Sequence, residues 1–85
     1  MRQNVAMKQF ITIPMVPMED AMNEKPVIKD FGISIENIDR IVTFDEPVNG
    51  FVTQVIMKDM YSYYSKLSAR MIVEIINGWK WISKV

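Results

Sequence analysis

The alternation of apolar and polar residues is clearest in "IDRIVTFD" (38–45), where it predicts a strand with one buried face. An Asn-Gly pair at 49–50 favours a two-residue type I′ turn. The next stretch, "FVTQVIMK", is rich in β-branched and aromatic residues and is typical of a returning strand. We therefore predict a hairpin over 38–58, which a turn at 59–60 and a short strand, "YSYYS" (61–65), extend into a meander.

The spacing of apolar residues then changes to that of a helix. A stripe at i, i+3, i+4 and i+7 can bury against the sheet, and it consists of Ala69, Ile72, Val73 and Ile76. The Ser68 hydroxyl can accept a hydrogen bond from a first-turn amide, and Gly78 suits the left-handed residue that ends a helix. We predict a helix over 69–77 with this stripe facing inward. The remainder, "WKWISKV" (79–85), suits a last strand or an irregular tail.

Prolines decide how the first part of the chain is interpreted. The stretch "KQFITIPMVP" (8–17) has the residue types of a strand but contains Pro14 and ends at Pro17. Because proline cannot donate to a sheet ladder, we predict an edge strand or an extended arm rather than a central strand. The polar "MEDAMNEK" (18–25) suits one helical turn or a loop, and "VIKDFGI" (27–33) is a short extended segment.

Together these elements predict an α+β fold. We expect a small antiparallel sheet of 3–4 strands arranged as a meander, with one C-terminal helix and an extended N-terminal arm. A chain of 85 residues holds one core. We therefore assign residues 1–25 to a hydrophobic arm or edge strand and residues 26–85 to a single small α+β domain.

Composition excludes several chemistries. The chain has no histidine and no cysteine, so serine triads, cysteine nucleophiles, disulfides and the common zinc sites are absent. Asp39, Asp45 and Glu46 are close in sequence, but no further acidic residue is spaced to complete a metal site. We predict that the protein is not an enzyme and that it has no metal and no cofactor.

The chain carries no targeting signal that we recognise. No apolar stretch approaches the roughly 18 residues that a membrane helix needs, and the basic and acidic side chains balance at ten each. We therefore expect a soluble, cytoplasmic protein that does not bind membranes. If a phage encodes it, the host cytoplasm or the virion is the expected location.

The order of elements over residues 34–77 resembles two known families. A polar turn leads into "IDRIV", a hairpin, "YYS" and the helix "SARMIVEII". This order is similar to that of small flagellar and swarming-motility proteins of the FlbD type, and to the last strands and helix of LytTR-type DNA-binding domains. In both families the short turn usually carries glycine, where this chain has Asp59-Met60. The resemblance implies a small, non-enzymatic regulatory or binding module.

Apolar residues in the N-terminal arm predict a protein interface. Tryptophan and methionine are enriched at interface cores, and the chain has two tryptophans and eight methionines. An exposed edge strand would also allow an added strand to pair with it. We predict an interaction or assembly module, such as a regulatory adaptor or an accessory protein, that binds another protein or itself as a homo-oligomer. The predicted interface residues are Phe10, Ile11, Ile13, Met15, Met18, Trp79 and Trp81.

Basic and aromatic residues near the C-terminus predict an alternative, a nucleic-acid-binding module. Residues 58–85 carry five basic and two acidic side chains, whereas residues 1–57 carry five and eight. Aromatic rings stack on bases while cations contact phosphates. Consecutive strand residues face opposite ways, so the tyrosines of "YSYYS" must lie on both faces of the sheet. The residues of this alternative are Lys58, Tyr61, Tyr64, Lys66, Arg70 and Lys80.

Overall fold

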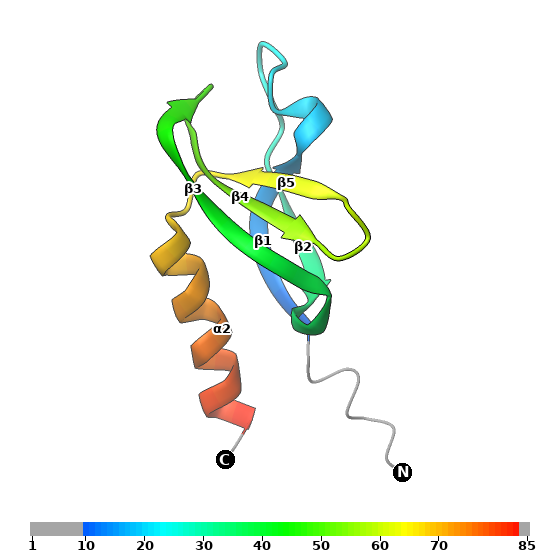
Figure 1. The fold of residues 1–85 in the computed structure, drawn as a ribbon, viewed down its shortest axis with the longest axis vertical. Helices are drawn as coiled ribbons and strands as arrows, with labels where there is room; N and C mark the ends of the chain where they lie inside the picture. Colours follow the sequence, from blue (N-terminus) through cyan, green and yellow to red (C-terminus); the bar gives the residue numbers. More distant parts are fainter. Residues whose placement is uncertain (1–9, 84–85) are drawn as a thin grey trace.

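The computed structural model describes the backbone of residues 10–83 and the side chains of residues 10–78. It contains five antiparallel strands, two single 3-10 turns (η1 and η2) and one described helix, α2, which lies against the sheet (Figure 1). The elements are β1 (Phe10–Pro17), η1 (Met18–Asp20), β2 (Lys29–Ser34), η2 (Ile35–Asn37), β3 (Ile38–Val48), β4 (Phe51–Met57), β5 (Ser62–Ser65) and α2 (Ala69–Ser83). The predicted α+β class is confirmed, but the sheet has five strands rather than three or four.

The strand order is β2-β1-β5-β4-β3, so β1 lies inside the sheet. β1 pairs with β2 through Phe10 to Met15 and with β5 through Val16 and Pro17. The prediction that this segment is an edge strand or a free arm is therefore wrong for residues 10–17. Residues 1–9 of the predicted arm lie outside the described residues.

Pro14 fits within β1 because its backbone nitrogen and carbonyl point away from β2. A hydrogen-bonded antiparallel pair exchanges two N–H···O bonds, so the pair Pro14–Asp30 must be a non-hydrogen-bonded one. The Pro14 carbonyl instead accepts a hydrogen bond from the Ser65 hydroxyl at 2.9 Å. The missing N–H of Pro14 thus removes no bond between β1 and β2, and the proline rule fails at this position.

The predicted hairpin is confirmed. β3 and β4 are joined at Asn49 and Gly50, whose φ angles of 52° and 86° are the positive values that a type I′ turn requires. The Asn49 side-chain amide donates to the carbonyls of Ala21 at 2.8 Å and Asn23 at 3.1 Å. The tip of the hairpin is thereby fixed to the segment between β1 and β2, which we call the connector (residues 18–28).

The main hydrophobic cluster lies on the inner face of a curled sheet. Its buried residues come from β1, β2, β4 and α2, although β2 and β4 are not neighbours in the strand order. β1 and β5 lie between them, and the strands bend around the cluster in Figure 1. The buried residues are Ile11, Ile13, Met15, Ile33, Val55, Met57 and Ile72.

A second, smaller cluster lies at the hairpin end. It buries Val16, Ala21 and Phe51, with Phe44 and Tyr64 packed against them. The consecutive residues Tyr63 and Tyr64 divide between the two clusters. The ring of Tyr63 lies 5.0 Å from that of Phe31 beside the main cluster, and the ring of Tyr64 lies 4.8 Å from that of Phe44. The predicted placement of tyrosines on both faces is thus confirmed.

Helix α2 begins as predicted and ends later. The amide of Met71 donates to the Ser68 hydroxyl at 3.1 Å, which confirms the N-cap. The helix continues through Gly78 to Ser83, because Gly78 does not take the left-handed conformation that would end it. Val73 is 43% exposed, while Ile75 packs on the main cluster. The predicted end at residue 77, the predicted strand or tail over 79–83 and the inward position of Val73 are therefore wrong.

Candidate functional site

The predicted interface residues divide between core and surface. Ile11, Ile13 and Met15 are buried in the main cluster of the chain itself, so they are not available to a second protein in this fold. Their apolar character is explained by the central position of β1. Phe10 and Met18 are exposed. The side chains of the two predicted tryptophans, Trp79 and Trp81, lie outside the described residues.

The predicted nucleic-acid residues around β5 have different environments. Lys58 and Tyr61 are exposed in the turn between β4 and β5. Tyr64 is half-buried and meets the ring of Phe44 edge-on, so it packs inside the protein rather than offering a free ring. Of the two tyrosines in the predicted set, only Tyr61 is an exposed aromatic residue.

The remaining basic residues of this set lie beyond the other end of β5. The Lys66 ammonium lies 5.7 Å from the centre of the Phe51 ring, and Arg70 pairs with Glu74 along α2 at 3.7 Å. The Lys80 side chain lies outside the described residues. Since β5 separates Lys58 and Tyr61 from Lys66, the described side chains do not form one stacking platform. Nucleic-acid binding therefore stays a prediction.

The connector carries exposed apolar residues that the sequence interpretation largely missed. Nine large hydrophobic residues are exposed in the described part of the chain, and four of them belong to this segment: Met18, Met22, Val27 and Ile28. Only Met18 was among the predicted interface residues. The sequence does contain an indication of these residues, because bulky apolar residues interrupt an otherwise polar stretch. Without the position of the connector, these residues were indistinguishable from core residues.

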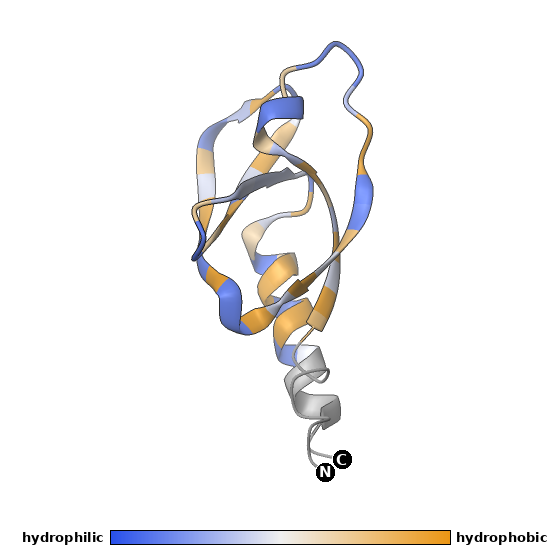
Figure 2. Cartoon of the chain, turned by 90° about the vertical axis from the view of Figure 1, so that its right-hand side faces the viewer, coloured by the Kyte–Doolittle hydropathy of each residue, from blue (hydrophilic) through white to orange (hydrophobic). Residues whose placement is uncertain are grey.

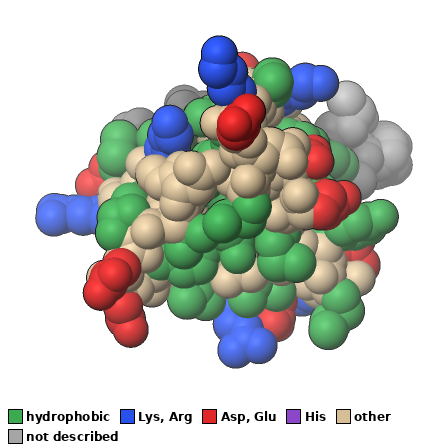
Figure 3. Space-filling model, turned by 90° about the horizontal axis from the view of Figure 1, so that it is seen from above, with side chains coloured by type: hydrophobic (Ala, Val, Ile, Leu, Met, Phe, Trp, Pro, Cys, Tyr) green, Lys and Arg blue, Asp and Glu red, His purple; other side chains and the backbone are tan. Residues whose placement is uncertain are grey.

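Seen from the end where the connector lies, hydrophobic side chains occupy the middle of the face and charged side chains surround them (Figure 3). Met22 and Val27 are each 68% exposed. The connector is not a free loop, because Ala21 is buried in the second cluster and Asn49 holds two of its carbonyls. The exposed apolar residues are thus presented by an anchored segment.

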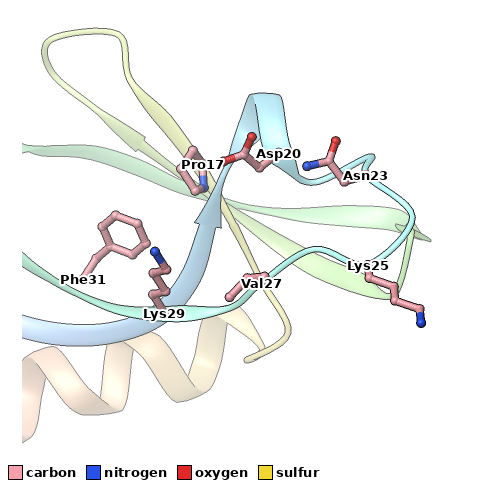
Figure 4. A pocket seen from close by; sticks show the side chains of 7 residues that line it. All are labelled: Pro17, Asp20, Asn23, Lys25, Val27, Lys29 and Phe31. Carbon is pink, nitrogen blue, oxygen red and sulfur yellow. The ribbon is translucent and has the colours of Figure 1, made fainter.

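A pocket of about 250 Å³ opens between η1 and the start of β2 (Figure 4). Three apolar residues, Pro17, Val27 and Phe31, form part of its wall, and the polar part consists of Asp20, Asn23, Lys25 and Lys29. In Figure 4 the Lys29 side chain extends between Phe31 and the turn that carries Asp20, whereas Lys25 points away from the other six residues. We call the pocket together with Met18, Met22 and Val27 the connector surface. Ile28 is not part of it, because it follows Val27 and faces the other side of the extended segment.

The alternation of β2 explains why the pocket forms. Residues 27, 29, 31 and 33 face the same side of the extended segment, which is the side of the core. Ile33 is buried and Phe31 is half-buried, whereas Lys29 and Val27 are exposed. The side chains on the inner face of β2 therefore belong to the main cluster at the C-terminal end of the strand and line the pocket at its N-terminal end. An apolar side chain placed there would extend the core.

The chain matches no protein-family model, no curated protein and no solved structure. Its resemblance to FlbD-type and LytTR-type proteins therefore stays a prediction.

Three further findings concern the described residues. Among them, no group of three or more acidic side chains is placed to hold a metal ion. Within the same residues, no helix has the combination of length and apolar character that crossing a membrane requires. The ion pairs of this part of the chain join Arg40 to Asp39 and Arg70 to Glu74, so they do not involve the charged residues of the pocket.

Proposed function

We propose that this protein is a non-enzymatic protein-interaction module that binds its partner through the connector surface. The observation that carries the proposal is the concentration of exposed apolar residues in an anchored segment beside an open pocket. A group of apolar side chains that is exposed to solvent and surrounded by charged residues is typical of a binding surface. Two of the three exposed apolar residues of this surface, Met18 and Met22, are methionines, whose flexible side chains adapt to a partner.

The size and charge of the connector surface favour a protein partner. Its pocket is smaller than the roughly 300–1,000 Å³ typical of sites for small molecules, and it suits a side chain or two. The connector and the start of β2 carry both acidic and basic residues, without the basic excess that phosphate contacts require. A second copy of the chain remains one of the candidate partners.

Photo-crosslinking tests this proposal. A benzoyl-phenylalanine replaces Met22 on the connector or, as a matched control, Met71, which is exposed on α2. In extracts of the source cell we expect position 22 to give a discrete adduct with a protein, which excess unlabelled chain competes away. The substitution Val27→Glu in the same chain should reduce the adduct about tenfold, since burying a charge at the centre of an interface is costly.

The outcomes separate the candidate partners. An adduct of twice the chain mass identifies a second copy, and a different mass identifies another protein. Equal adducts from positions 22 and 71, or no adduct from position 22, would contradict the proposal. A mobility shift with single-stranded DNA or RNA that weakens with salt and with Lys58→Ala would instead favour the nucleic-acid alternative.

A further inference from the structure

The two edges of the sheet differ in how well they resist pairing with another strand. β3 has two register irregularities, and Pro47 and exposed charges such as Asp45 and Glu46 lie along it. Bulges, prolines and charges are the features by which edge strands avoid further pairing. β2 pairs in unbroken register with β1 from Lys29 to Ser34 and contains no proline. β2 is therefore the less protected of the two edges. Figure 2 shows the sheet from the side that faces right in Figure 1, with hydrophobic and hydrophilic residues interspersed along its strands.

The position of Pro14 identifies the backbone groups that β2 presents at this edge. Pro14 and Asp30 form a non-hydrogen-bonded pair, so the N–H and C=O of Asp30 point away from β1. Because this direction alternates along a strand, the N–H and C=O of Gly32 also point outward. A Cβ atom added at Gly32 would meet no atom within 4 Å. The open edge therefore offers outward donors and acceptors at Asp30 and at Gly32, and alanine fits at Gly32 without a clash.

We propose that β2 binds an extended segment of the partner protein as an added sixth strand, with one apolar side chain of that segment in the connector pocket. Strand addition supplies affinity through main-chain hydrogen bonds and specificity through pockets for alternate side chains. The pocket is well placed for this, because Val27, Lys29 and Phe31 line it from the same face of the β2 segment. The inference rests on the protein-binding role proposed above and specifies how the partner is held.

Charge defines the chemistry of the added strand. Lys29 lies two residues from Val27 on the pocket side, and neither Lys29 nor Lys25 takes part in the ion pairs of the described residues. The segment should therefore carry an acidic residue level with Lys29, two positions from the apolar residue beside Val27. Asp20 lies on the opposite wall of the pocket, on η1 rather than on β2. Its carboxylate can accept a hydrogen bond from a backbone amide of the bound segment.

Nuclear magnetic resonance of the full chain with a defined peptide tests strand addition. The probe is the capped octapeptide Ser-Thr-Ile-Thr-Glu-Thr-Val-Ser, which alternates apolar or acidic residues with threonine. We expect saturable shifts of the Asp30 and Gly32 amide resonances, together with hydrogen exchange at these amides that is slowed at least tenfold. Gly32→Pro removes an outward N–H and should abolish binding, whereas the matched control Gly32→Ala keeps it. Thermal unfolding of both variants establishes that they are folded.

A charge exchange adds a second readout. Replacing the glutamate of the peptide by lysine should weaken binding about threefold, and Lys29→Glu in the protein should restore it, as expected for one exposed ion pair. Strand addition is overturned by binding that survives Gly32→Pro, by shifts confined to β3 or α2, or by no binding. It is also overturned by dimerisation through β2 in the absence of peptide. A crosslinked partner that binds the Gly32→Pro variant unchanged would overturn strand addition and leave the protein-binding role intact.

Discussion

The two hydrophobic clusters differ in which parts of the chain they join. The main cluster collects buried residues from three strands and the helix, whereas the second buries three residues near the hairpin tip. Tyr63 and Tyr64 lie on β5 between them, one ring packed toward each cluster. The difference indicates a division of roles, in which the main cluster stabilises the fold and the second cluster holds the connector in place. The following substitutions test this division.

The largest loss should follow Ile13→Ala. Ile13 is fully buried in the main cluster, and such truncations cost about 2–5 kcal/mol, enough to unfold much of a small domain. Urea unfolding monitored by tryptophan fluorescence and circular dichroism measures the change. The matched substitution Ile28→Ala, at a partly exposed position of the connector, should change the free energy of unfolding by less than about 0.5 kcal/mol. Equal losses at both positions would contradict the assignment of the core.

Asn49→Ala should loosen the connector and leave the main cluster intact. The substitution removes two hydrogen bonds to the connector and puts alanine at a φ of 52°, for a total of about 2 kcal/mol. Hydrogen exchange should accelerate in residues 21–23 much more than in β1. Asn49→Gly keeps the turn and isolates the loss of the hydrogen bonds. If exchange in β1 accelerates equally, the two clusters are not separable.

Ser68→Ala should weaken the attachment of α2 to the main cluster. The Ser68 hydroxyl accepts the Met71 amide at the start of the helix, and loss of an N-cap costs about 1 kcal/mol. Urea unfolding should show this loss, and Ser68→Asp should recover most of it. An unchanged midpoint for Ser68→Ala would indicate that the cap contributes nothing.

The smallest effect should be a gain, at a turn that belongs to neither cluster. Met60 has a φ of 78° and is 84% exposed, so its side chain strains the backbone without packing. Met60→Gly should raise the free energy of unfolding by about 0.5–1 kcal/mol, since glycine adopts positive φ without a Cβ clash. Thermal unfolding of both variants measures the change, and Met60→Ala, which keeps the Cβ atom, should show no gain.

The sequence predicts those elements that depend on neighbouring residues. The hairpin, its Asn-Gly turn and the Ser68 cap each follow from a few adjacent positions, and each is confirmed. The central position of β1 was missed, because it comes from the pairing of Val16 and Pro17 with Tyr64 and Tyr63, which are far away in the chain. The residues around a proline do not show toward which neighbouring strand its missing backbone N–H would have pointed.

The candidate site was predicted only at Met18. Apolar residues of β1 and of the connector look alike in the sequence, yet Ile13 is buried and Val27 is exposed. Ile13 is surrounded by other strands and Val27 is not, and this difference is decided by how the strands pair in the folded chain. A surface of this kind is found only once the core has been assigned to other residues.

The pairing of β1 with β5 has a consequence for the order of folding. Val16 pairs with Tyr64, whereas the strands of the hairpin are joined by two residues. Closing the longer loop costs more entropy, so we expect the meander of β3, β4 and β5 to form first and β1 to dock later. During synthesis β1 leaves the ribosome before its partner β5 exists. Its apolar side chains remain exposed to solvent until β5 has been synthesised. In the cell, a newly made chain should depend most on chaperones during that interval.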